Sequence, residues 1–233
     1  FIPGDLFRYC KSTAIIHSAF RGSGGADYDA DNGLGWPNTL KKGFYGAIPP
    51  YLFENVRNTR SLKYMFCGLK GITPYNWAQK ESILGNMYPP QLLRNMHSLT
   101  DVSHMFDGCY VYPYTKIPDE FFTTNVRIQD ASYLFNNCKF ADKVNEQVPS
   151  ALFARCRGIQ NVSYMFARGD YSSVRAPYKM DKNLFTPEKN PSINDIRCFM
   201  YMADNTSGSV PEFWNTGFAN MRNVTKAYKG LTS

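Results

Sequence analysis

Apolar and polar positions along the chain repeat in a two-part pattern. Most copies open with an apolar residue and a proline, have apolar residues three and four positions after the proline, and close with a second apolar block. In six of the seven copies, the proline and the final aromatic residue lie seventeen positions apart. A spacing held this constant indicates an array of structural repeats. The seven copies end at Phe20, Phe66, Phe106, Phe135, Phe166, Met200 and Tyr228.

The second block of each copy predicts a short helix. In the third copy, Leu99, Val102, Met105 and Phe106 have the spacing that places four side chains on one helical face. An Asp or Asn stands five positions before the final aromatic residue in several copies, where it would act as a helix N-cap. Two positions after the final aromatic residue, several copies have a residue that tolerates the left-handed conformation at a helix C-terminus. These residues are Gly22, Gly68, Gly108, Asn137 and Gly230.

The first block predicts a second short helix, because proline suits the first turn of a helix. The residue before each proline is held extended, which favours a short strand there. The sequence therefore predicts an α/β solenoid of about seven strand–helix–helix repeats with short parallel β rungs. We expect one repeat domain spanning 1–233, with insertions at 23–47 and 69–87, within a longer chain. The side chains expected to be buried at equivalent places are Val102, Phe106, Phe135, Val162 and Phe166.

Two segments carry a family resemblance. D-V-S-H-M-F-D-G-C at 101–109 and N-V-S-Y-M-F at 161–166 each follow a Pro-x-x-Leu-Leu/Phe block. They resemble BspA-like leucine-rich-repeat proteins of bacterial surfaces, whose repeats carry V-[ST]-x-M-F-x-x-C. The resemblance covers nearly the whole chain outside the two insertions. It implies a leucine-rich-repeat-like solenoid at the cell surface that adheres to host proteins or other cells. The signature cysteine stands at its usual place only as Cys109 and Cys138.

Composition narrows the function classes. Hydrophobic residues make up 43% of the chain and aromatic residues 15%, which excludes intrinsic disorder. No apolar stretch approaches the length of a membrane span. The net charge is +7, but Lys and Arg are scattered and form no nucleic-acid-binding motif, so we expect no nucleic-acid partner. The six cysteines show no metal-binding spacing, and we expect Cys109 and Cys138 to remain thiols because side chains in register run parallel.

Aromatic residues supply the candidate binding sites. Tyr64, His104, Tyr133 and Tyr164 stand two positions before the final aromatic residue, where they would form a stripe across successive repeats. Packing between adjacent helices explains this stripe as well. The two insertions should emerge side by side and contribute Trp36, Tyr75 and Trp77. These rings would form a platform for a protein or a glycan, or would pack the insertions against the solenoid.

One acidic segment resembles the start of a calcium loop. Asp27, Asp29 and Asp31 alternate before Gly33, but the glycine comes one position late and the bidentate Glu is missing. A solvated acidic turn is the other explanation. Calcium is the one cofactor that the sequence suggests.

Nothing in the sequence points to catalysis, because it shows no catalytic triad order, phosphate loop or nucleophile elbow. We therefore expect a non-enzymatic, extracellular or cell-surface adhesion module that recognises a protein. The alternatives are a surface glycan-binding protein of a polysaccharide-uptake system and a structural component of a larger assembly.

Overall fold

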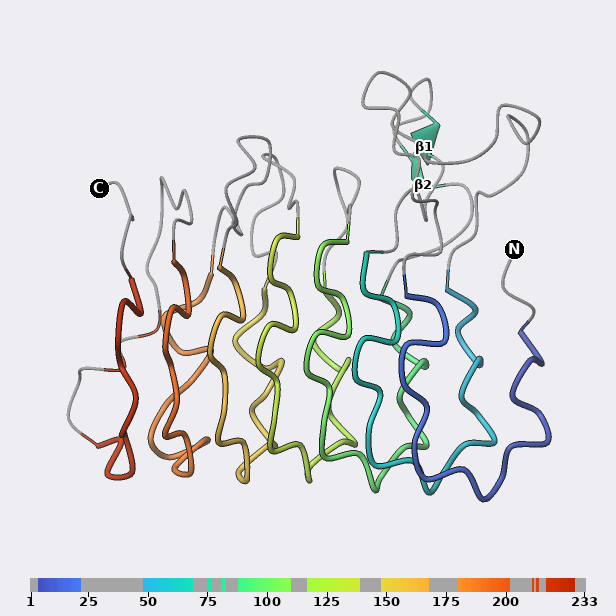
Figure 1. Cartoon of the computed structure of the whole chain (residues 1–233), viewed down its shortest axis with the longest axis horizontal. Coiled ribbons are helices and arrows are strands. Elements are labelled where there is room, and N and C mark those ends of the chain that lie inside the picture. Colours follow the sequence, from blue (N-terminus) through green and yellow to red (C-terminus); the bar gives the residue numbers. More distant parts are fainter. Residues whose placement is uncertain are drawn as a thin grey trace.

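Successive copies of the repeat form coils that stack side by side. The computed structural model describes residues 4–21, 48–68, 75–76, 81–82, 88–109, 117–138, 148–167, 180–201, 211, 213 and 217–228. The coils follow one another in chain order, from the blue N-terminal coil to the red C-terminal coil (Figure 1). Parallel bridges join each coil to the next, and one series of bridges runs through an equivalent residue of every coil. These residues are Ile15, Ser61, Asp101, Asp130, Asn161, Asp195 and Asn223.

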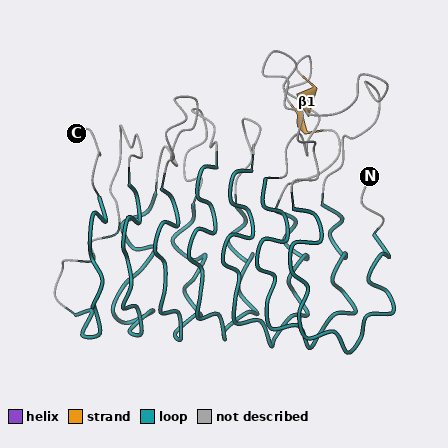
Figure 2. Cartoon of the chain, viewed as in Figure 1, coloured by secondary structure: helices purple, strands orange, loops and turns teal. Residues whose placement is uncertain are grey.

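Secondary structure in the described residues consists of turns, single bridges and one small hairpin. The strands β1 (Tyr75–Asn76) and β2 (Glu81–Ser82) pair antiparallel within the second insertion. No helix occurs in the described part of the chain (Figure 2). The predicted α/β fold of strand–helix–helix repeats is therefore wrong. The insertion at 23–47 lies outside the described residues.

The backbone hydrogen bonds explain why the second block forms no helix. In residues 102–109, every second N–H donates to a carbonyl of the following coil, as His104 does to Ser132 at 2.9 Å and Phe106 to Leu134 at 3.0 Å. The N–H groups of Met105, Asp107 and Cys109 instead donate to the carbonyl three positions earlier. All these donors are satisfied without the bonds to the fourth preceding carbonyl that define an α-helix.

The residues predicted as helix caps direct the chain into turns instead. The Asp101 Oδ1 atom accepts a hydrogen bond from the Ser103 N–H at 2.9 Å, as an N-cap side chain would. The next residue, His104, has a φ of 55°, which ends any right-handed helix at once. Gly108 has the left-handed φ expected for it, 68°, but it closes a turn in which Cys109 donates to the Phe106 carbonyl.

The proline block also forms turns. Proline begins a turn in which the third following residue donates its N–H back to the proline carbonyl, as Leu52 does to Pro49 and Leu152 does to Pro149, both at 3.1 Å. A helix begun at proline would continue this pattern with bonds spanning four residues. The next donor, Glu54, instead bonds to the Tyr51 carbonyl, and the turn sequence continues without a helix.

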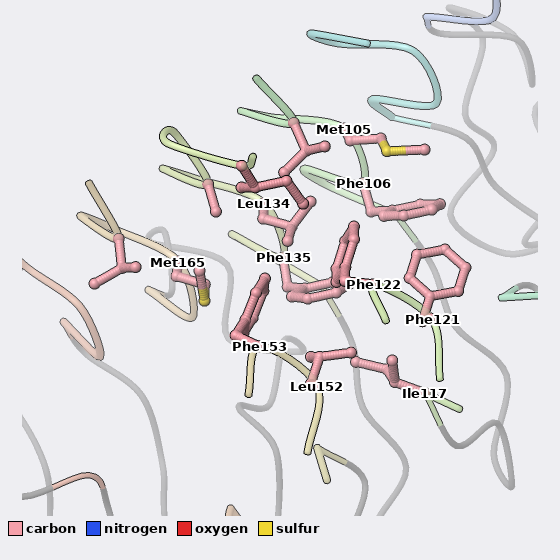
Figure 3. Close-up of a cluster of buried hydrophobic side chains, with 14 of the residues drawn as sticks. Met105, Phe106, Ile117, Phe121, Phe122, Leu134, Phe135, Leu152, Phe153 and Met165 are labelled. Atoms are coloured by element: carbon pink, nitrogen blue, oxygen red, sulfur yellow. The ribbon is translucent and has the colours of Figure 1, made fainter. Parts of the chain in front are cut away.

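The interior of the coils contains the predicted core. Val102, Phe106, Phe135, Val162 and Phe166 are all buried, as the repeat pattern predicted. The Phe106 and Phe135 rings stack at 5.9 Å between centroids, and Phe135 and Phe166 stack at 5.6 Å. Figure 3 shows Phe106 and Phe135 in this stack, with Phe122 and Phe153 alongside. Equivalent side chains therefore occupy equivalent places, so the predicted register is confirmed.

Buried polar side chains connect the coils further. The Asn125 amide nitrogen donates to the Leu93 carbonyl at 3.0 Å and to the Met96 carbonyl at 2.9 Å, all in the preceding coil. Such bonds satisfy polar groups that would otherwise be buried without partners. Cys109 and Cys138 remain thiols, as predicted, and each donates to a carbonyl of the coil before it. The parallel direction of these two bonds is consistent with the absence of a disulfide between them.

Candidate functional site: the aromatic row

Four aromatic side chains from four consecutive coils form one row. We call Tyr64, His104, Tyr133 and Tyr164 the aromatic row; each is partly buried. Each residue has a φ between 55° and 57° and occupies the same turn of its coil. Non-glycine residues adopt this left-handed conformation infrequently. Repetition of this turn therefore brings the side chains of the predicted stripe together.

The rings of the aromatic row stack face to face. The centroids of Tyr64 and His104 lie 4.3 Å apart, those of His104 and Tyr133 lie 4.3 Å apart, and those of Tyr133 and Tyr164 lie 4.4 Å apart. The planes of the last two pairs differ by only 9° and 7°. Each ring face within the row is thus covered by its neighbour, and the ring edges form the accessible part.

Cations lie over the ring of Tyr64 at one end of the aromatic row, and a thiol contacts Tyr164 at the other end. The Arg21 guanidinium lies 4.6 Å from the centroid of Tyr64, a cation–π distance, and the Lys63 ammonium lies 5.4 Å from it. Cys198 occupies the equivalent turn of the coil after Tyr164, with a φ of 51°, and its thiol hydrogen-bonds with the Tyr164 side chain. The ring faces within the stack are therefore closed to a sugar ring that would stack on them.

Polar contacts fix the orientation of His104. Its Nδ1 atom lies 2.7 Å from Asp107 Oδ2, and the other oxygen of that carboxylate accepts from the Asn136 amide at 2.8 Å. Because an ionised carboxylate only accepts hydrogen bonds, the His104 proton must be on Nδ1. The Asp107 carboxylate thus connects two coils and holds the imidazole in the stack.

The phenols of Tyr133 and Tyr164 stay neutral at physiological pH. Burial raises the pKa of Tyr133. The hydrogen bond with Cys198, followed by burial, raises the pKa of Tyr164 to about 12. Nearby, burial raises the pKa of the Cys67 thiol to about 11. Tyr133 and Tyr164 therefore offer neutral hydrogen-bonding edges, and the cations of Arg21 and Lys63 lie at the Tyr64 end of the row.

A second polar cluster, which was not predicted from the sequence, joins His17 to the bridge residues Ser61 and Asp101. His17 Nε2 lies 2.7 Å from Ser61 Oγ, which donates to Asp101 Oδ2 at 2.8 Å. Since the single hydroxyl proton of Ser61 goes to Asp101, His17 Nε2 must donate and cannot act as the base that activates this serine. The order of the hydrogen bonds thus differs from that of a hydrolase triad. The signal available in the sequence was the register, which puts Ser61 where other copies have Asp or Asn.

The remaining predicted sites receive no structural test. Trp36, Trp77 and the proposed calcium ligands Asp27, Asp29 and Asp31 lie outside the described residues. Tyr75 lies in β1, and its side chain is outside what the structure describes. Within the described ranges, no group of three or more His, Cys, Asp or Glu side chains could hold a metal ion.

Comparison with known proteins assigns the chain to no family. No protein-family model, curated protein or solved structure matches the chain. In the described part of the chain, no helix has the length and hydropathy that crossing a membrane requires.

Proposed function

We propose that the chain is an extracellular or cell-surface binding module that recognises a protein partner through the edge of the aromatic row. The observation that carries this proposal is the face-to-face stacking of His104 and Tyr133 at 4.3 Å and 9°. Such packing hides the ring faces and leaves a row of edges and polar groups. Rigid Tyr side chains with a polar tip are typical anchors of protein interfaces.

The same stacking argues against a glycan as the ligand of this row, since carbohydrate binding by aromatic residues uses open ring faces. A glycan-binding role based on ring stacking therefore depends on the insertion residues Trp36, Tyr75 and Trp77.

The proposed location outside the cell is supported by the resemblance to BspA-like surface proteins. The thiols of Cys67 and Cys156 are compatible with this location, because both are poorly reactive. Burial raises the pKa of Cys156 to about 12 and that of Cys67 to about 11, so both are protonated at neutral pH. Thiolates, and not thiols, are the forms that oxidise readily. Labelling of intact producing cells with an antibody against the chain tests this location, which intracellular staining alone would contradict.

Binding of the fluorescently labelled chain to a panel of bacterial and animal cells tests the proposed function. We expect protease treatment of the target cells to abolish binding and periodate oxidation of their glycans to leave it intact. Tyr133→Ala should weaken binding at least about tenfold, the usual effect of removing an interface anchor. The matched control is Tyr51→Ala, which removes an exposed tyrosine outside the row. Equal binding by both variants, or loss of binding after periodate alone, would contradict the proposal.

A further inference from the structure

One edge of the stack is lined by exposed arginines. The two blocks of each coil are joined by a turn, and these turns lie along one edge of the stack, the lower edge in Figure 1. Lys and Arg are scattered along the sequence, but the repeat gathers six arginines from four consecutive internal coils at or beside these turns. We call this set the basic edge; its members are Arg57, Arg60, Arg94, Arg127, Arg155 and Arg157, all exposed.

Acidic residues are nearly missing from the same parts of the coils. The six arginines lie in four segments, 54–60, 94–100, 123–129 and 154–160. Glu54 is the only acidic residue in these segments. The basic edge therefore concentrates positive charge that a count over the whole chain does not reveal.

Hydrogen bonds fix the turns of the basic edge relative to one another. A turn is closed where the Ile128 N–H donates to the Asn125 carbonyl at 3.2 Å. Neighbouring coils are also joined here, since the Asn95 amide donates to the Glu54 carbonyl at 3.1 Å. Coils joined by parallel bridges lie about 5 Å apart, so the four coils span roughly 15 Å. Each of them contributes at least one arginine, and the positive charges therefore recur along the direction in which the coils stack.

The positive charge of the basic edge is not compensated within the described part of the chain. No carboxylate described there forms an ion pair with any of the six guanidinium groups. The Arg157 guanidinium donates to the backbone carbonyl of Glu188 at 2.9 Å, which orients the group without neutralising its charge. An exposed, uncompensated line of arginines attracts a polyanion.

The other side chains of the four segments discriminate among polyanions. The segments contain no Phe, Tyr or Trp, whereas proteins that bind single-stranded nucleic acids stack the bases on aromatic rings. Val126 is the one large apolar side chain exposed in them, whereas protein interfaces and membrane-bound surfaces use several apolar or aromatic anchors. Gln129 and Gln160, exposed on adjacent coils, supply amides that can bond to sugar hydroxyls. These features favour an anionic polysaccharide.

We propose that the basic edge binds a linear sulfated polysaccharide that lies along the direction of coil stacking. Sulfate groups are ionised at every physiological pH, and the planar guanidinium fork binds the oxygens of such anions in pairs. This contact uses charge and hydrogen bonds, so it needs none of the open ring faces on which a sugar would stack. The site goes beyond the proposed recognition of a protein and shares no residue with the aromatic row.

Isothermal titration calorimetry of the full chain with heparin, a sulfated polysaccharide, tests the proposal. We expect binding at about 50 mM salt that weakens steeply as salt is added, because the arginines displace condensed counterions. Chemically desulfated heparin should not bind. Arg127→Gln should weaken binding about tenfold and reduce the slope of log affinity against log salt by roughly one. Glu54→Gln should strengthen binding, since it removes the one negative charge of the four segments, and a misfolded variant would not do so.

The matched control is Lys182→Gln, which removes a positive charge from an exposed side chain outside the basic edge and should bind heparin like the unaltered chain. Tyr133→Ala should also bind heparin normally, so failure of the aromatic row and failure of the basic edge give different results. Far-UV circular dichroism and melting curves establish that the variants fold.

Three results would overturn the proposal. The first is an unaltered chain that does not bind heparin at about 50 mM salt. The second is an equal loss of affinity in Arg127→Gln and Lys182→Gln, which would reduce the effect to net charge. The third is tighter binding of single-stranded DNA, polyglutamate or phosphatidylserine vesicles than of heparin, which would assign the basic edge to that class of partner.

Discussion

The imidazole ring of His104 and the phenol ring of Tyr133 lie 4.3 Å apart and almost parallel. The two residues occupy the same turn of adjacent coils, and the cross-coil bond from the His104 N–H to the Ser132 carbonyl sets their separation. The aromatic row therefore depends on the stacking of coils and not on local structure within one repeat.

Phe166→Ala should lower the free energy of unfolding by about 3–5 kcal/mol, because it removes a buried ring from the continuous stack with Phe135. Chemical denaturation measures this loss. The control Tyr51→Ala removes an exposed ring and should change stability by no more than about 0.5 kcal/mol. A loss below about 1 kcal/mol for Phe166→Ala would mean that this ring is not part of a buried stack.

Gly108→Ala should destabilise the protein by about 1–2 kcal/mol, the cost of holding an alanine in the left-handed region. Gly108 has a φ of 68°, and an added Cβ would approach the Gly68 Cα only to 3.8 Å, so no clash adds to this cost. Gly108→Asn should cost less than the alanine variant, because Asn137 adopts the same conformation at the equivalent position. Thermal or chemical unfolding measures the stability that each variant loses. Equal losses of stability in the two variants would contradict the conformational explanation.

The period and the core were predictable from the sequence, whereas the helices were not. Val102, Met105 and Phe106 have the spacing of a helical face, but in the coils the same spacing directs all three inward from consecutive turns. Apolar spacing alone thus does not distinguish a short helix from this series of turns. The deciding feature is the cross-coil bonding of alternate N–H groups, such as that of His104, which no single repeat contains.

The candidate site was predictable in its members but not in its geometry. Regular spacing identified Tyr64, His104, Tyr133 and Tyr164 as one column. The four rings cover one another's faces because of the distance between adjacent coils. The sequence does not specify this distance. The Ser61 cluster with His17 and Asp101 was missed because the three residues come from three different coils.

Asp130→Ala should destabilise the protein by about 0.5–2 kcal/mol, the range measured for losing a side chain that accepts from an N–H group at the start of a turn or helix. The Asp130 Oδ1 atom accepts from the Ser132 N–H at 2.8 Å. The matched control is Asp130→Asn, which should retain most of the stability because Asn161 makes the same bond to Ser163. Denaturation curves compare the two variants, and an alanine variant as stable as the asparagine variant would show that the bond contributes nothing.

Stability should fall in alkaline solution partly because of Cys156. Burial raises the pKa of its thiol from 9.0 to about 12, so above pH 9 the unfolded chain loses this proton and the folded chain keeps it. The stabilising contribution is fully present below pH 9 and is lost as the pH rises toward 12, at a slope approaching about 1.4 kcal/mol per pH unit.

Cys156→Val isolates the effect of this thiol, since Val56 fills the equivalent position of another coil. Denaturation between pH 8 and 11 should give a shallower decline for the variant than for the unaltered chain. Parallel declines would show that this thiol does not titrate as its burial requires.

Nuclear magnetic resonance couplings across hydrogen bonds test the central claim most directly, namely that alternate N–H groups of each repeat bond to the next coil. The coupling from the His104 amide nitrogen should lead to the carbonyl carbon of Ser132, and that from Phe106 should lead to Leu134. A coupling from His104 to the carbonyl of Thr100, as an α-helix requires, would contradict both the series of turns and the aromatic row built on it.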